Sequence, residues 1–149
     1  MSHTFAALTF HIAFSTKDRI ACIDPGTQAR LFPYVGGIIR EAGGRVLIVN
    51  GATDHVHILA ALPPALNVSD LVRVVKTNSS KWMHQTMKKG TFAWQTGYGA
   101  FSVSHSNVDS VTKYIAGQAE HHKRRSFQAE FLALLKKHGV EYDEGYIWD

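Results

Sequence analysis

Hydrophobic positions along the chain recur with two periods, which predict strands and helices in turn. Runs rich in apolar, aromatic and β-branched residues predict four strands, over residues 5–14, 45–50, 55–62 and 94–104. Apolar residues three or four positions apart predict a helix between Pro25 and Gly43, and another after Pro63-Pro64 that Asn67 or Ser69 would cap. The resulting order is strand, helix, strand, strand, helix, strand.

That order is typical of the ferredoxin-like (RRM-like) α+β fold, an antiparallel sheet with its helices on one face. Residues 51–54 form a short turn between the second and third strands, so we expect those strands to pair as an antiparallel hairpin. The other face of the sheet is expected to be free. Nucleic acid or a catalytic site is common on such a face, although a fold does not decide a function.

Two further helices are predicted after the fourth strand. One opens at Ser106-Asn107-Val108-Asp109, which resembles a capping box, and extends to Arg125. The next begins after Ser126, which would cap it, and ends at Gly139. The chain therefore carries a helical C-terminal part beyond the sheet.

Length and composition are those of one globular domain. The chain has 149 residues, of which 45% are hydrophobic, so we expect a single domain over residues 1–149, with a core at 1–104 and a helical tail at 105–149. No apolar run approaches the roughly 20 residues that span a bilayer, and the N-terminus lacks the features of a signal peptide. We expect a cytoplasmic protein without membrane contact. Cys22 is the only cysteine, which excludes an intramolecular disulfide.

The net charge is +4, with nine histidines left out of the count, and favours a polyanionic partner such as nucleic acid. Many proteins without such a partner have a similar excess. Charge alone therefore does not distinguish a nucleic-acid-binding protein from an ordinary basic one.

The third predicted strand opens with Asp54-His55-Val56-His57. Side chains alternate along a strand, so His55 and His57 point to the same side. Neutral imidazole is a common ligand of catalytic divalent ions, and two converging imidazoles predict part of a metal site. Two ordinary strand histidines would give the same pattern. His11, inside the first strand, is equally compatible with a core role and a functional one.

Tyr114 and Gln118 lie one turn apart on the same side of the first C-terminal helix. Taken alone, this pair is more typical of a tyrosine at the edge of the core beside a solvated glutamine. The pair follows the last predicted strand, and it becomes a candidate for a functional role when it is considered together with His55 and His57.

His55-Val56-His57 on a strand, followed by Tyr114-x-x-x-Gln118 on a helix, resembles the single-tyrosine HUH transposases of the smallest bacterial insertion sequences, the TnpA type in the REP-associated tyrosine transposase-like superfamily. The similarity covers nearly the whole chain. Its main segments are residues 34–38, 50–57, 94–101, 114–122 and 141–149. Gly145 departs from the pattern, since a basic residue is expected there, and this affects a peripheral contact only.

The resemblance implies a DNA transposase that cleaves and rejoins single-stranded DNA at the ends of an insertion sequence. Tyr114 would be the nucleophile, and His55, His57 and Gln118 would bind one Mg²⁺ or Mn²⁺ ion. Cleavage would leave a 5′-phosphotyrosine and a free 3′ hydroxyl. The covalent bond conserves the energy of the phosphodiester, so rejoining would need no ATP.

Partners also follow from the resemblance. They are a DNA hairpin at the element ends and a second copy of the chain, in a homodimer where one subunit's tyrosine helix can complete the other subunit's histidine pair. Whether Tyr114 acts in its own subunit is left open. The basic residues expected to contact the DNA backbone are Lys17, Arg19, Arg73 and Lys76.

Tyrosine has a free pKa of about 10, so at neutral pH another group must remove or weaken its proton. Lys113, His121 and His122 are near in sequence, and the field of the metal is a further candidate. The sequence does not choose among them.

Two other classes of function remain open at this point. One is a nucleic-acid-binding module or regulator on the same fold, which would bind DNA without needing Tyr114 or a metal. The other is a small metal-dependent hydrolase in which Tyr114 only orients a water, so that turnover would proceed without a covalent adduct.

Overall fold

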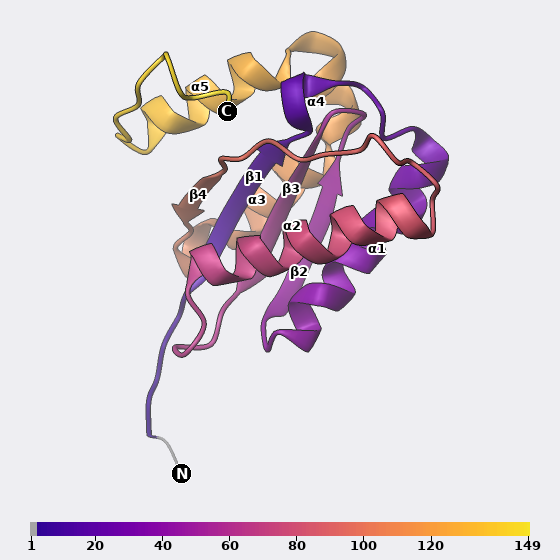
Figure 1. Ribbon diagram of the computed structural model, residues 1–149. Helices are drawn as coiled ribbons and strands as arrows, with labels where there is room; N and C mark the ends of the chain where they lie inside the picture. Colours follow the sequence, from indigo (N-terminus) through magenta and orange to yellow (C-terminus); the bar gives the residue numbers. More distant parts are fainter. Residues whose placement is uncertain (1–2) are drawn as a thin grey trace.

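The computed structural model describes residues 3–149, and its centre is an antiparallel sheet of four strands (Figure 1). The strands are β1 (Thr9–Ser15), β2 (Arg45–Gly51), β3 (His55–Ala61) and β4 (Gly99–Ser102). They lie in the order β2-β3-β1-β4, so β1 and β3 are central. This order and the helices between the strands confirm the predicted ferredoxin-like fold.

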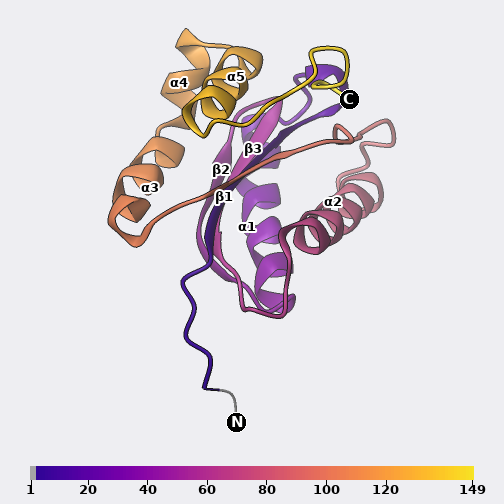
Figure 2. The ribbon, with the colours of Figure 1, turned by 90° about the vertical axis from the view of Figure 1, so that its left-hand side faces the viewer.

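Helices α1 (Pro25–Glu41) and α2 (Val68–Gln85) cover one face of the sheet (Figure 2). Both begin at predicted positions, because Asp24 accepts a hydrogen bond from the Thr27 amide and Asn67 accepts one from the Asp70 amide, each at 2.8 Å. The core beneath them is built from alternate residues of the central strands together with the inner stripes of both helices. Its fully buried members include Ile12, Phe14, Leu31, Val35, Ile39, Val56, Ile58, Leu71 and Val75.

The opposite face is covered as well, and the expectation of a free face was wrong (Figure 2). It carries α3 (Val108–Ala116), α4 (Gln118–Arg124) and α5 (Phe127–Lys137). Besides the histidines, this face of the sheet carries buried apolar residues. Leu59 packs with Val103 and Ile115, while Ala13 and Phe101 pack with Phe127. Burial of this second apolar surface draws the C-terminal helices onto the sheet.

The single helix predicted from Ser106 to Arg125 is two helices. Gly117 separates α3 from α4, and its amide donates to the carbonyls of Lys113 at 3.1 Å and Tyr114 at 3.2 Å. The hydrogen bonds tighten the end of α3, and the chain then changes direction into α4. Gln118 therefore starts a new helix.

The fourth strand is shorter than the predicted 94–104. The Gln95 amide still donates to the Ser15 carbonyl of β1 at 2.9 Å, but regular pairing with β1 starts only at Gly99. Before that point the Lys76 ammonium donates to the carbonyls of Gln95, Thr96 and Gly97, at 2.8, 3.0 and 2.6 Å. The first strand is also shorter at its N-terminal end, since β1 begins at Thr9. Among residues 3–149, no helix is long and apolar enough to cross a membrane.

Gly51 permits the tight turn that presents the histidine pair. A Cβ atom at this position would lie 2.2 Å from the carbonyl oxygen of His55, far inside contact distance. We expect Gly51→Ala to lower the free energy of unfolding by more than about 2 kcal/mol, because the strands must separate to admit the methyl group. Thermal and urea denaturation measure this change.

Gly37→Ala is the matched control for that substitution. Gly37 lies inside α1, and a Cβ there has no neighbour within 4 Å. This variant should be as stable as the unmodified protein or more stable, by up to about 1 kcal/mol. If Gly51→Ala behaved in the same way, the turn would not be as tight as described.

Candidate active site

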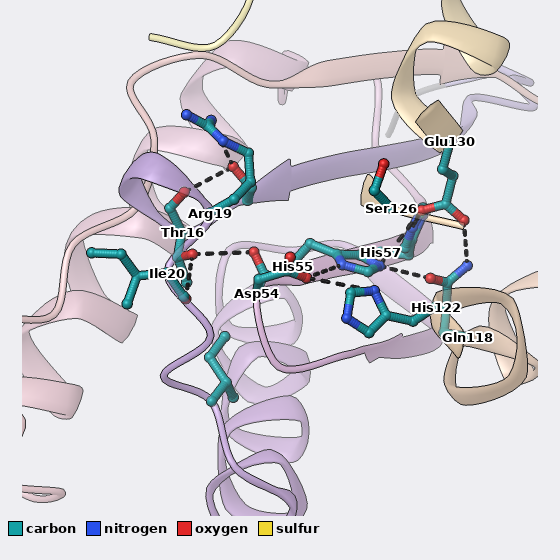
Figure 3. Close-up of polar contacts among 12 residues, drawn as sticks. Thr16, Arg19, Ile20, Asp54, His55, His57, Gln118, His122, Ser126 and Glu130 are labelled. Carbon is teal, nitrogen blue, oxygen red and sulfur yellow. Dashed lines mark hydrogen bonds and ion pairs between the residues drawn. The ribbon is translucent and has the colours of Figure 1, made fainter. Parts of the chain in front are cut away.

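His55 and His57 lie side by side on β3, under the C-terminal helices (Figure 3). Their side chains are 1% and 0% exposed, and their ring centroids are 5.1 Å apart. Both point to the face that α3, α4 and α5 cover, as alternation along the strand predicts. The pair is thus part of a buried polar cluster.

His55 joins this cluster through both ring nitrogens. Its Nδ1 lies 2.7 Å from a carboxylate oxygen of Asp54, and its Nε2 lies 2.7 Å from Oε1 of Gln118. The Gln118 amide is oriented by its own nitrogen, which donates to Glu130 Oε2 at 2.9 Å. When His55 donates from Nδ1 to Asp54, the lone pair of Nε2 therefore faces an acceptor oxygen. A metal ion bound to both atoms would fit this arrangement.

His57 is held in a similar way. Its Nδ1 lies 2.7 Å from Nε2 of His11, and its own Nε2 lies 2.8 Å from Oε1 of Glu130. Burial lowers the pKa of His57, and burial together with the neighbouring His57 lowers the pKa of His11 to about 3. Both imidazoles are therefore neutral at physiological pH, which is the form that binds metals. His11 is thus a buried histidine with a bonded partner, and that partner is His57 of the candidate site.

Tyr114 reaches the same cluster from α3. Its hydroxyl donates to Oε2 of Glu130, and its ring stacks on His121 with centroids 4.7 Å apart. Burial raises the pKa of the Tyr114 phenol, and the hydrogen bond to the Glu130 carboxylate raises it further. Asn50, at the end of β2, fixes the C-terminal end of α3 by donating to the Ile115 carbonyl at 2.9 Å. The nucleophile predicted from the sequence is therefore positioned by the sheet.

Glu130 is the residue that the sequence analysis missed. It lies on α5, is 4% exposed, and accepts hydrogen bonds from His57, Tyr114 and Gln118. Burial alone would raise the pKa of the Glu130 carboxyl, but these hydrogen bonds outweigh it and hold that pKa well below its usual range. A signal was present in the sequence: Glu130 falls within the apolar stripe of Phe127, Phe131 and Leu134, where a charged residue is out of place.

These side chains fit a divalent ion. The ligand atoms of His55, His57 and Glu130 all lie within 4.8 Å of one another. Neighbouring ligands of an octahedral ion, each about 2.1 Å from it, are separated by about 3 Å. The observed separations are 2.7 Å from His55 to Gln118, 2.8 Å from His57 to Glu130 and 3.5 Å from His55 to Glu130. Asp54 and His11 bond the remaining nitrogens, as partners of metal-bound histidines usually do.

Another group of side chains adjoins this cluster. Asp54, His55 and His122 also have potential ligand atoms within 4.8 Å of one another. Within residues 3–149, Nδ1 of His122 is the buried side-chain atom left without a hydrogen-bond partner, 3.8 Å from Asp54. Since His55 belongs to both groups, His122 extends the same site outward.

The structure does not gather the predicted DNA-binding residues at the cluster. Arg19 donates to the Trp148 carbonyl at 2.9 Å and lies over the Trp148 ring, while Lys76 binds the carbonyls described above. Arg73 is exposed and 3.6 Å from Asp70, and Lys17 is exposed beside a separate cavity. Lys76 and Arg19 thus have structural roles, and DNA contact by all four residues stays a prediction.

A cavity of about 580 Å³ opens beside Tyr114, between α3, α5 and the sheet. Its polar lining residues are His11, Ser102, Asn107, Ser110, Tyr114, Arg125, Lys137 and His138. The cavity combines cationic side chains with hydroxyl and amide groups next to the candidate nucleophile. Such a lining suits an anionic ligand.

Comparison with known proteins assigns the family. The profile of the family described as "Transposase IS200 like" matches residues 4–118, a span that ends at Gln118 and contains Tyr114 and both histidines. The chain belongs to this transposase family. It is therefore an enzyme that processes DNA in transposition. The resemblance to TnpA-type single-tyrosine transposases is confirmed.

Individual relatives agree with this assignment. The transposase for insertion sequence element IS200 of Salmonella typhimurium is 28% identical over 133 residues, covering 83% of this chain and 84% of the relative. Two solved structures share the fold. One, assigned to a transposase from Deinococcus radiodurans, has a TM-score of 0.63 and 21% identity and covers 79% of this transposase and 95% of that chain. The other, a REP-associated tyrosine transposase bound to a REP hairpin, has a TM-score of 0.61 and 15% identity, with coverages of 82% and 74%.

Proposed function

We propose that this transposase cleaves and rejoins single-stranded DNA through a covalent bond to Tyr114, at a divalent-metal site formed by His55, His57 and Gln118. The observation that carries the proposal is the convergence of these groups. The Tyr114 hydroxyl and the Gln118 amide both donate to one oxygen of Glu130, whose other oxygen faces the two histidines. The Glu130 carboxylate thus contacts both the proposed nucleophile and the proposed metal ligands.

The chemistry follows from the nucleophile. The Tyr114 oxygen attacks the phosphorus of a DNA phosphodiester, and the bond from phosphorus to the 3′ oxygen breaks. The phenolic proton is lost and the leaving 3′ oxygen gains one, so that the products are a 5′-phosphotyrosine and a free 3′ hydroxyl. A bound Mg²⁺ or Mn²⁺ supplies Lewis-acid stabilisation of charge on the phosphate and the leaving oxygen.

Rejoining is the reverse reaction with a different strand. A 3′ hydroxyl attacks the phosphotyrosine, a phosphodiester forms, and Tyr114 is released with its proton. One ester bond is exchanged for another at each step, so the sequence needs no ATP. The buried histidines and Gln118 keep the site in place between the two steps.

The substrate is proposed to be a strand with a hairpin at the element end. Two observations support it: a solved structure of the same fold holds a REP hairpin, and the cavity beside Tyr114 carries Arg125 and Lys137. Those cations can bind phosphates on either side of the cleaved bond. A homodimer is also proposed. In the present structure Tyr114 lies at the histidines of its own chain, 6.0 Å from His57 between ring centroids.

The test uses labelled single strands from both DNA flanks of the encoding gene, incubated with the protein and either Mg²⁺ or a chelator. We expect a slow-migrating covalent adduct on a denaturing gel, with Mg²⁺ only and with one strand of each complementary pair. The metal requirement follows from the buried ligand cluster. Binding of the strands without any adduct would indicate a binding module, and cleavage without an adduct would indicate a hydrolase.

A further inference from the structure

We infer that Glu130 is a fourth protein ligand of the divalent ion, so that the site combines two imidazoles, one amide and one carboxylate. The inference rests on the proposed metal site and adds to it a residue outside the segment that matches the family, which ends at residue 118. The position of the carboxylate, its burial and its partners each support the assignment.

The position comes first. Glu130 Oε1 is 2.8 Å from His57 Nε2 and 3.5 Å from His55 Nε2, on the side of both rings that points away from their orienting partners (Figure 3). An ion bound by both Nε2 atoms would have to lie next to this oxygen. Glu130 is also the residue that touches each of the other site members, because its second oxygen accepts from Tyr114 and Gln118.

The burial of Glu130 is the second observation. Its neighbours along the inner side of α5, Phe127 and Phe131, pack into an apolar cluster with Phe101. A carboxylate in such surroundings costs several kcal/mol unless charge and hydrogen bonds compensate for it. The two histidines are the basic side chains paired with Glu130, and the metal-binding form of each is neutral. A divalent ion would supply the positive charge that the carboxylate lacks.

The third observation concerns how α5 is held. Ser126 caps the helix by accepting from the Ala129 amide at 3.2 Å, and Trp148 packs against Phe131 from the C-terminal segment. The helix is therefore fixed at the sheet by contacts that do not involve the acid. Glu130 is presented to the histidines by a rigid element, as a metal ligand must be.

A carboxylate changes what the site does. Three neutral ligands leave the ion its full double charge, whereas Glu130 neutralises one unit and strengthens binding of a hard cation such as Mg²⁺ or Mn²⁺. The second oxygen of Glu130 would hold the Tyr114 hydroxyl by a hydrogen bond while the first oxygen binds the ion. The site would then bind metal before DNA arrives.

The experiment measures Mn²⁺ binding to the full chain without DNA, by calorimetry and by the electron paramagnetic resonance signal of free Mn²⁺. We expect Glu130→Gln to raise the dissociation constant at least about tenfold, since even outer partners of metal ligands contribute about 10- to 100-fold. Glu130→Asp, which keeps the charge but shortens the side chain, should have a smaller effect. Circular dichroism establishes whether each variant is folded. If Glu130→Gln does not fold, the Mn²⁺ affinity of Glu130→Asp decides the test.

Glu120→Gln is the matched control. It removes the same charge from α4, where Glu120 is exposed and pairs with Lys123 at 3.3 Å, and it should leave Mn²⁺ affinity within about twofold. Unchanged affinity in the folded Glu130 variants would overturn the inference, as would no Mn²⁺ binding by the unmodified chain. The adduct assay is separate: weaker Mn²⁺ binding in Glu130→Gln supports the ligand even if no strand forms an adduct.

Discussion

Tyr114→Phe should abolish the covalent protein–DNA adduct and lower strand cleavage by about 10⁴-fold or more, because it removes the only proposed nucleophile. The phenyl ring keeps the stacking on His121 and the packing of α3, so the fold is retained. Glu130 loses one hydrogen-bond donor but keeps those from His57 and Gln118. The measurement is a denaturing gel with labelled single strands and Mg²⁺.

Tyr146→Phe is the matched control, since the Tyr146 side chain is 72% exposed and lies in the C-terminal segment. It should form the adduct at the rate of the unmodified enzyme. An adduct that survives in Tyr114→Phe would show that another residue attacks the DNA. In that case the cluster around Glu130 would need a different explanation.

The histidine pair and the tyrosine helix could be predicted from the sequence because both depend on local geometry. Alternation along a strand places His55 and His57 on one side, and this rule needs only a few residues of regular structure. The helical repeat expected to join Tyr114 and Gln118 is interrupted at Gly117, although both side chains reach Glu130. The structure has the two histidines on β3 and the tyrosine on α3, and it brings all four side chains to Glu130.

Glu130 could not be assigned in the same way, because its role depends on where α5 packs. It follows Gln118 by twelve residues and a change of helix, and no local repeat connects the two. Its contact with His57 spans 73 positions. The sequence shows that Glu130 interrupts an apolar helical stripe. Only the packing of α5 on β1 and β4 shows which side chains Glu130 contacts.

The differences between the predicted and the observed fold also arise from contacts between residues far apart in the sequence. The boundaries of β2 and β3 were predicted to within one residue because a turn sets them on both sides. The fourth strand was overestimated, since regular pairing with β1 starts only at Gly99 and the Lys76 ammonium binds the carbonyls of residues 95–97. Long-range hydrogen bonds and burial of the second apolar face are tertiary effects that no local pattern contains.

His55→Ala should weaken Mn²⁺ binding by at least about 100-fold and eliminate metal-dependent adduct formation, because it removes a ligand that Asp54 holds in place. The same change leaves a cavity against Phe127, whose ring centroid is 4.8 Å from that of His55, and should cost about 2–3 kcal/mol of unfolding free energy. Mn²⁺ calorimetry and the adduct gel measure the first effect, and urea denaturation measures the second.

His84→Ala separates these effects, since it removes an imidazole that bonds the Phe92 carbonyl at 2.6 Å, away from the site. It should lose stability but keep Mn²⁺ binding and the adduct. Mixing His55→Ala with Tyr114→Phe protein then tests whether Tyr114 acts across the subunits of the proposed homodimer. If the tyrosine of one subunit serves the histidines of the other, the mixture regains activity, because one composite site contains both intact groups. If each site is built from one chain, as in the present structure, both variants stay inactive at every mixing ratio.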